Sequence, residues 1–496
     1  MNDYSTTKHN RFMSHGLLFA TCLMFCIPSL SAQDLRETKK SDPTWESLKS
    51  PTGPKWFEDA KFGIFIHWGP WSVSETPPWD IYKRKSVSYP RLKARFGGMP
   101  PEYGFKDLIP MFTAENWDPN QWSKLFAQAG AKYVILTGEH HDGYVLSDST
   151  LTPWCATKTG PKRDLVGDLA TAVRAKGMKF APSYHRERHP GMFSEKQFIH
   201  SSPPYPDVAE EIKRMPEAAQ LYGPFEYSDA FIVDYVARWK EWEKKYQPDF
   251  MWIDDVPFFY RDKQHPQVAK FQNAYLKMII EYFEISRTWG KEVYLNNKGQ
   301  EGKLNWPDEV GCYERDGMLL DEPSKQKWQC PMTMGNAWFY SSQEEKENKY
   351  KSPETLIHLL CDIVSKNGNL LLNIGPKPDG TVPDAMQTRL LAIGEWLKVN
   401  GEAIYGTRPW VIYKQHELNL RFTTKGNVLY AIALEKPQKP FVIQLGRELN
   451  SKNVTEISLL GSYNQLKWSR EENGVRIVPP KEWPGKYAWT FKMGII

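Results

Sequence analysis

The segment Asp249–Val256, with the sequence DFMWIDDV, is an apolar run that ends in two adjacent carboxylates, Asp254 and Asp255. Burial of a charge costs free energy unless the charge is paired or used, so this pattern marks a candidate reactive site. A solvated acid at the end of an ordinary strand is the alternative. A further acid, Glu314, closes another short apolar run, VGCYE.

Other polar side chains also follow short apolar segments. They are His67; His140, His141 and Asp142; Tyr184 and His185; Asn296 and Asn297. Barrel enzymes place their functional groups at the C-terminal ends of the strands. We therefore expect these side chains to meet at one end of a sheet or barrel.

This set of side chains has three possible interpretations. Glycoside hydrolysis with retention needs two carboxyl groups roughly 5 Å apart, and Asp254 and Glu314 supply them as nucleophile and acid. Metal-dependent hydrolysis would use His67, His140, His141 and Asp254, but adjacent residues of a strand point to opposite faces, which disfavours an ion shared by His140 and His141. In the third interpretation each histidine only satisfies a buried partner.

The elements around these residues alternate. Short apolar segments predict strands at 61–69, 132–143, 178–185, 249–256, 292–297, 310–314 and 369–376. Helical patterns fall at 116–130, 164–177, 229–246, 268–289 and 353–368. Strands alternating with helices indicate parallel strands joined by crossover helices. The number of these units predicts a (β/α)8-like catalytic domain over residues 55–407 rather than an open doubly wound sheet. No GxGxxG motif follows the first strand, which disfavours dinucleotide binding.

Both ends of the chain differ from this pattern. Lys8 and Arg11 precede a short apolar stretch and small residues, which predicts a secretory signal peptide over residues 1–32. Residues 33–54 form a polar lead-in, and residues 408–496 contain short β-rich runs that predict an antiparallel β-sandwich. No other apolar run is as long, so we expect no membrane span after signal removal and a secreted or periplasmic location.

Composition narrows the class of partner. The net charge is +5 with both signs intermixed, and no Lys/Arg tract indicates a nucleic-acid partner. Aromatic residues make up 14% of the chain, including 20 Trp, which fits sugar-binding faces or a Trp-rich core. The four cysteines after the signal peptide form no CxxC pair, which disfavours a zinc site. An exporting compartment allows one disulfide, whose partners the spacing does not identify.

Four motifs strengthen the glycosidase interpretation. In chain order they are WFEDAKFGIFIHWGPWS, GAKYVILTGEHHDGY, PDFMWIDD and SKNGNLLLNIGPKPDGTVP. From about Trp56 to Trp410 the chain resembles the family 29 glycoside hydrolases, the α-L-fucosidases. The resemblance implies a barrel followed by a β-sandwich, retention of configuration, no metal or organic cofactor, and a fucosylated or related L-sugar glycan as substrate.

The resemblance also implies roles for individual residues. Asp254 matches the nucleophile and Glu314 the acid/base, with Glu322 as the fallback. The residues matched to sugar binding are His67, His140, His141, Tyr184, Trp252 and Trp338.

Three positions depart from the family pattern. Trp79 matches a Glu-Trp pair whose acid is replaced by Pro78, with Glu75 or Asp80 as substitutes. Lys298 stands where the family has arginine, and Asp255 where it has a small or apolar residue. A polar Asp255 near C6 of the sugar would favour an α-L-galactosidase acting on an algal galactan. Loss of either carboxylate would instead favour a non-catalytic carbohydrate-binding protein.

Overall fold

The computed structural model describes residues 45–49, 53–196, 201–254, 266–298, 309–446, 449 and 451–496. The predicted signal peptide and most of the polar lead-in lie outside these residues. Asp255 lies outside them as well.

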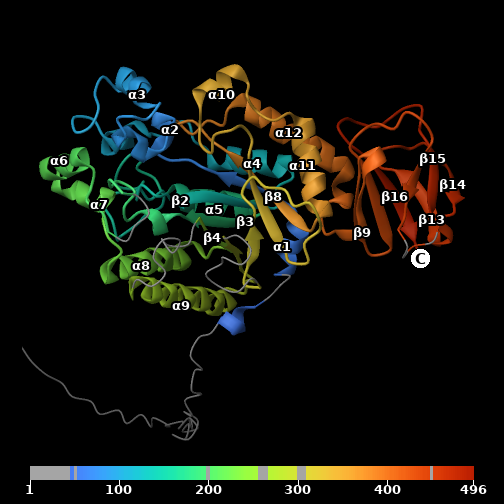
Figure 1. Cartoon of the computed structure of the whole chain (residues 1–496), viewed down its shortest axis with the longest axis horizontal. Coiled ribbons are helices and arrows are strands. Elements are labelled where there is room, and N and C mark those ends of the chain that lie inside the picture. Colours follow the sequence, from blue (N-terminus) through green and yellow to red (C-terminus); the bar gives the residue numbers. More distant parts are fainter. Residues whose placement is uncertain are drawn as a thin grey trace, which may run out of the picture. The chain divides into compact units, whose positions relative to one another are not determined.

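Eight parallel strands close into a barrel in chain order (Figure 1). They are β1 Phe62–Ile66, β2 Tyr133–Glu139, β3 Lys179–Tyr184, β4 Phe250–Ile253, β5 Tyr294–Asn297, β6 Cys312–Glu314, β7 Trp328–Thr333 and β8 Gly368–Ile374. The predicted barrel is confirmed. The sequence did not predict β7, whose segment WQCPMT contains Pro331, a residue that lowers the strand signal.

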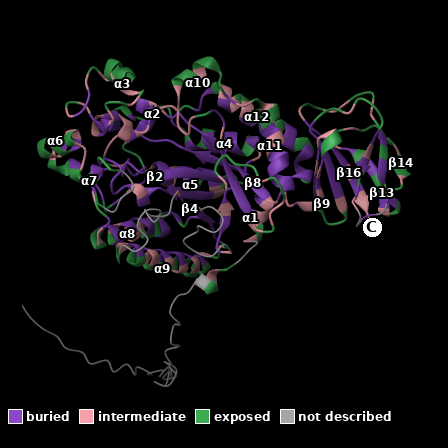
Figure 2. Cartoon of the chain, in the orientation of Figure 1, coloured by how far each residue is buried: buried purple, intermediate pink, exposed green. Residues whose placement is uncertain are grey.

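Helices surround the barrel, and Figure 2 shows buried strands inside a half-exposed layer. The α-helices are α1 Lys55–Ala60, α2 Trp71–Ser74, α3 Tyr89–Phe96, α4 Pro119–Ala129, α5 Leu165–Ala175, α6 Pro206–Arg214, α7 Ala219–Tyr222, α8 Asp229–Tyr246, α9 Pro266–Thr288, α10 Ser342–Glu347, α11 Pro353–Ser365 and α12 Asp384–Asn400. The five predicted helices correspond to α4, α5, α8, α9 and α11, whereas α12 was not predicted. Residues 315–327, between β6 and β7, contain no helix, so the barrel departs from the regular alternation there.

Local signals explain where α4 begins and ends. The Asp118 side chain accepts a hydrogen bond from the Asn120 N–H, and Pro119 occupies the first helical position. Gly130 closes the helix in the left-handed conformation, with φ of 89°. The helix then turns directly into β2.

Strand alternation divides the barrel into two cores. Phe65, Tyr133, Phe250, Trp252 and Tyr294 fill the interior with other residues of the same parity, and the intervening residues pack outward under the helices. Gly63 belongs to the interior layer, where a Cβ would lie 2.4 Å from the Tyr133 ring. Glycine at this position therefore makes room for the tyrosine.

The C-terminal residues form two antiparallel sheets, with strand orders β13-β16-β11-β10-β9 and β12-β15-β14. The strands are β9 Arg408–Gln415, β10 Leu420–Lys425, β11 Val428–Ala433, β12 Phe441–Gln444, β13 Val454–Leu459, β14 Lys467–Glu471, β15 Gly474–Val478 and β16 Trp489–Ile495. A separate apolar core lies between the sheets. The antiparallel β-sandwich is confirmed, and the exact domain boundaries stay a prediction.

Ion pairs join the barrel to the C-terminal sheets. Arg408 donates to Glu58 at 2.8 Å and to Asp59 at 2.9 Å, and Arg421 donates to Asp362 of α11 at 2.6 Å.

The four cysteines of the described chain, Cys155, Cys312, Cys330 and Cys361, are buried free thiols. None of the helices in the described ranges is long and apolar enough to cross a bilayer.

Candidate active site

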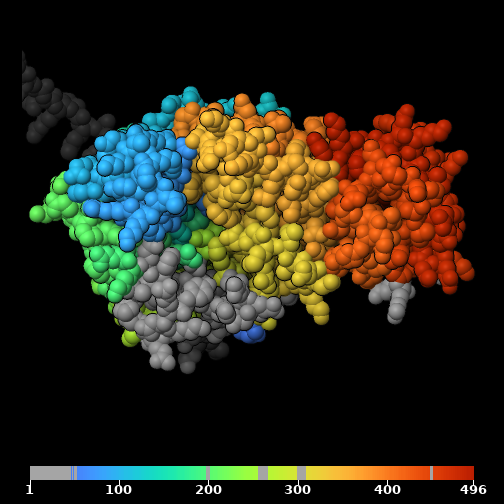
Figure 3. All heavy atoms as spheres, turned by 45° about the horizontal axis from the view of Figure 1, so that its top comes forward, coloured from blue at the N-terminus to red at the C-terminus, as the bar shows by residue number. Residues whose placement is uncertain are grey.

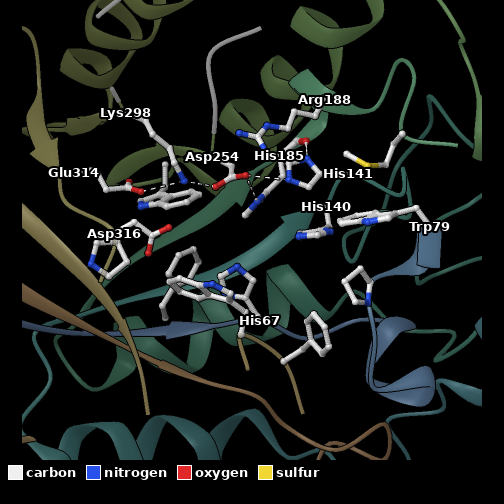
Figure 4. Close-up of a pocket in the computed structure, with 17 residues that line it drawn as sticks. His67, Trp79, His140, His141, His185, Arg188, Asp254, Lys298, Glu314 and Asp316 are labelled. Atoms are coloured by element: carbon white, nitrogen blue, oxygen red, sulfur yellow. Dashed lines mark hydrogen bonds and ion pairs between the residues drawn. The ribbon is translucent and has the colours of Figure 1, made fainter. Parts of the chain in front are cut away.

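A cavity of about 370 Å³ opens at the C-terminal end of the barrel strands. Figure 4 shows the side chains that converge on it. Its lining consists of Phe65, His67, Pro77, Trp79, His140, His141, His185, Arg188, Met192, Trp252, Asp254, Lys298, Glu314, Asp316, Pro331, Trp338 and Phe339. The predicted meeting of strand-end polar groups is confirmed for His67, His140, His141 and His185, whereas Asp142, Tyr184, Asn296 and Asn297 are absent from this lining.

Side chains of a strand alternate between its two sides, and this alternation directs the central residues of the site into the barrel. On β4, Phe250 and Trp252 face the barrel interior, and Asp254 follows with the same parity. Its backbone N–H donates to the Tyr184 carbonyl at 3.0 Å, which fixes the strand end. Cys312 likewise precedes Glu314 on β6, and Tyr294 precedes Asn296 and Lys298 on β5.

Lys298 lies between the two carboxylates. Its ammonium contacts Asp254 Oδ1 at 2.5 Å and Glu314 Oε1 at 3.2 Å. These two contacts limit the separation of the two carboxylate oxygens to less than about 6 Å, a limit that is compatible with the ~5–5.5 Å of paired carboxylates in retaining glycosidases. Asn296 holds the other oxygen of Glu314, because its amide donates to Oε2 at 2.6 Å.

The two carboxyl groups have opposite proton affinities. Burial would raise the pKa of Asp254, but the Lys298 ammonium and the rings of His185 and His141 hold that pKa well below its usual range. Burial raises the pKa of Glu314 to about 7; Lys298 and Asn296 oppose this rise, while Asp316 and Asp254 add to it. Asp254 is therefore an ionised group and Glu314 a proton donor near neutral pH.

The histidines of the site are mostly neutral donors and acceptors. Burial lowers the pKa of His67 to about 3 and that of His141 to about 4, and it also lowers the pKa of His185. His67 Nδ1 lies 2.7 Å from Asn373 Oδ1 of β8, whose amide group donates to the Trp338 carbonyl. Such rings suit uncharged hydroxyl groups.

His140 and His141 both line the cavity, which corrects the expectation that they point to opposite faces. Strand β2 ends at Glu139, after a register shift between Thr137 and Glu139, so the alternation rule no longer applies to the pair. The ring of His140 packs against that of Trp71, with 4.6 Å between the ring centroids. It also lies nearly parallel to the Trp79 ring, with the centroids 6.2 Å apart.

Aromatic side chains form the walls. The centroid of the Trp252 ring lies 4.7 Å from that of Phe65 and 5.1 Å from that of His185. The ring centroids of Trp338 and His67 are 5.0 Å apart. At the rim, the blue segment around α3 adjoins the gold segment around α10 (Figure 3). Glu75 joins these segments by accepting hydrogen bonds from the Ser342 N–H at 2.9 Å and the Ser342 hydroxyl at 2.6 Å.

Two predicted site residues lie elsewhere. Tyr184 has the outward parity of β3, is fully buried, and donates its hydroxyl to the Tyr235 carbonyl at 2.8 Å. It therefore does not line the cavity as expected, whereas its neighbour His185 does. The fallback acid Glu322 accepts a hydrogen bond from Tyr413 of β9 at 3.0 Å and does not line the cavity. The proposed substitutes Glu75 and Asp80 are also absent from the lining.

Sequence reasoning assigned no role to four residues at the site, Arg188, Asp316, His185 and Asn296, although the last two were noted as strand-end residues. Two of them follow a simple rule, since His185 lies two residues after the inward Ser183 and Asp316 two residues after Glu314. Asn296 was noted as a strand-end residue, but its contact with Glu314 depends on the pairing of β5 with β6. Arg188 lies in the short 3-10 helix Arg186–Arg188, for which no sequence signal was available.

Comparison with known proteins decides the family. Residues 29–402 match the family model described as alpha-L-fucosidase, and residues 414–494 match the model of the alpha-L-fucosidase C-terminal domain. The chain belongs to the α-L-fucosidase family. It is a glycoside hydrolase, as the paired carboxylates of the cavity also indicate.

The similarity extends over nearly the whole chain. Human tissue alpha-L-fucosidase is 30% identical over 499 residues, covering 95% of each chain, and human plasma alpha-L-fucosidase is 32% identical over 474 residues, covering 91% of this chain and 92% of the relative. A crystal structure of Thermotoga maritima alpha-fucosidase with a mechanism-based inhibitor superposes with a TM-score of 0.74 at 30% identity, covering 92% of this chain and 100% of the other.

Proposed function

We propose that this protein is a retaining exo-α-L-fucosidase that removes terminal α-L-fucose from glycans by double displacement. One observation is central to this proposal: Lys298 contacts both Asp254 and Glu314, so the two carboxylates face the same small cavity. Solved relatives include Thermotoga maritima alpha-fucosidase in complex with fucose, which supports the same sugar here. The reaction would take place outside the cytoplasm, in a secreted or periplasmic enzyme.

In the first step Asp254 attacks the anomeric carbon while Glu314 protonates the departing glycosidic oxygen. The low pKa of Asp254 keeps the nucleophile ionised, and the pKa of about 7 leaves Glu314 protonated below neutral pH and partly protonated at it. In the second step ionised Glu314 takes a proton from water, and that water releases the sugar from Asp254. No step needs a metal or an organic cofactor.

The walls suit a compact deoxysugar. Trp252, Trp338 and Phe65 present apolar faces, which can pack against the C–H side of a sugar ring. His67, His140, His141 and His185 line the same cavity and can hydrogen-bond sugar hydroxyls.

Substrate preference tests the proposal. We expect purified enzyme to hydrolyse an aryl α-L-fucoside with a kcat/KM at least about 10-fold above that for the aryl α-L-galactoside, which has an additional hydroxyl at C6. The rates of aglycone release from the two compounds give the ratio. An equal or higher value for the galactoside would replace the fucosidase assignment by the α-L-galactosidase alternative.

The pH profile should show the asymmetry of the two carboxyl groups. Protonated Glu314 is the active form in the first step, so kcat/KM should fall as pH rises through about 7. Asp316 raises the pKa of Glu314, so the Asp316→Asn variant should move this alkaline limb to lower pH. A limb that stays in place in the variant would show that Glu314 does not set it.

A further inference from the structure

The cavity also contains a set of donor atoms that matches a metal site. His141 Nε2 lies 3.0 Å from Asp254 Oδ2, and His185 Nδ1 lies 3.5 Å from the same oxygen. The three atoms all lie within 4.8 Å of one another. Figure 4 shows both rings turned toward this carboxylate oxygen.

The remaining ring nitrogens have partners of the kind that metal-bound histidines use. His141 Nδ1 lies 2.6 Å from the His185 carbonyl; a carbonyl only accepts, so Nδ1 holds the proton and donates it. His185 Nε2 lies 2.7 Å from Ser183 Oγ. Orientation of each ring through its other nitrogen is typical of zinc ligands.

The contact between His141 and Asp254 brings two lone pairs together. Since Nδ1 donates its proton to a carbonyl, Nε2 of the neutral ring presents its lone pair to a carboxylate oxygen 3.0 Å away. A divalent metal ion satisfies both atoms at once. The Asp254 side chain is 16% exposed, so an ion can reach it from the cavity.

We propose that His141, His185 and Asp254 form an inhibitory Zn²⁺ site that blocks the nucleophile. Two imidazole nitrogens and one carboxylate oxygen, with water in the fourth position, make a coordination set that zinc accepts. On binding, any proton on His141 Nε2 passes to solvent, and His185 keeps its proton on Nε2, where Ser183 Oγ accepts it. The metal prevents sugar from reaching Asp254, so inhibition is competitive with substrate.

The surrounding charges limit the affinity. Lys298 binds Oδ1 of the same carboxylate at 2.5 Å, and Arg188 lines the same cavity. Both cations oppose a dication, so the site is weaker than a dedicated structural zinc site. Reversal by EDTA is therefore expected within minutes of mixing.

A second trio, His67, His140 and His185, offers donor atoms at similar separations. It lacks a carboxylate, and His67 Nδ1 already contacts Asn373 Oδ1 at 2.7 Å. Variants separate the two trios, because Asp254 and His141 belong only to the first and His67 only to the second.

The test is calorimetric titration of zinc chloride into the full-length protein after treatment with EDTA and desalting. We expect one Zn²⁺ per chain, with affinity reduced at least about 10-fold in Asp254→Asn and in His141→Gln. The affinity should be unchanged in His67→Gln and in the surface control His416→Gln, whose histidine is exposed. Thermal melts of each variant establish that it is folded.

The same samples test the inhibition. Zn²⁺ should raise the apparent KM for an aryl α-L-fucoside without changing kcat, and EDTA should restore the rate. Absence of binding, equal affinity in Asp254→Asn, or loss of binding in His67→Gln would each overturn the proposal. Only the inhibition depends on the proposed function, since the binding measurement succeeds or fails whatever the substrate.

Discussion

Replacement of Asp254 by Asn should lower kcat/KM on an aryl α-L-fucoside by about 10⁴-fold or more, the order of loss when a catalytic nucleophile is removed. Asparagine has nearly the same shape but no charge, so it cannot form the glycosyl-enzyme. Lys298 keeps its contact with Glu314 at 3.2 Å, so the cavity should persist. Initial rates over a substrate range, with a thermal melt of each protein, measure this.

A smaller side chain allows a chemical control. In Asp254→Gly, azide can occupy the vacated volume and attack the anomeric carbon of the substrate once. The product should be β-L-fucosyl azide, which has inverted configuration. Near-normal hydrolysis by Asp254→Asn, or an α-azide from Asp254→Gly, would assign the nucleophile elsewhere.

Replacement of Glu314 by Ala should cost about 10²- to 10⁴-fold on substrates with poor leaving groups, because the departing oxygen receives no proton. An activated aryl fucoside needs less protonation, so its first step should survive and the glycosyl-enzyme should accumulate. Azide should then restore turnover and give α-L-fucosyl azide, because the second displacement restores the original configuration. Proton NMR of the anomeric proton identifies the product.

The matched control for this experiment is Glu322→Ala. Its carboxylate accepts a hydrogen bond from Tyr413 and lies outside the cavity lining, so its rate should stay near that of the unmodified enzyme. Azide rescue of Glu322→Ala, together with no rescue of Glu314→Ala, would transfer the acid/base role to Glu322.

Strand parity explains why so much of the site follows from the sequence. Trp252 and Asp254 lie two residues apart on the same side of β4, and Glu314 follows Cys312 in the same way on β6. A parallel barrel gathers all such ends into one opening. Once the strands were recognised, the meeting of Asp254, Glu314 and His67 needed no further information.

The errors occur where the strand rules do not apply. His140 and His141 come after the end of β2, so their directions depend on the loop rather than on alternation. Tyr184 was selected by resemblance although its parity on β3 is outward, and the neighbouring His185 faces the site. Proline in β7 concealed that strand from pattern analysis.

Lys298 illustrates what sequence alone leaves out. As a substitution for arginine it predicted only the loss of a planar, forked donor. In the folded chain its ammonium lies between Asp254 and Glu314, and this depends on the pairing of β5 with β4 and with β6. The limit on the separation of the two carboxylates therefore required the structure.

In the proposed mechanism Asp254 forms a covalent bond to the sugar. The most direct measurement is incubation with 2-deoxy-2-fluoro-L-fucosyl fluoride, whose fluorine slows the second step, followed by mass spectrometry of the intact protein and its peptides. We predict one added fluorofucosyl group per chain, located on the peptide that contains Asp254 and absent in Asp254→Asn. An adduct on Glu314, or a protein that turns over the reagent without any adduct, would contradict the mechanism.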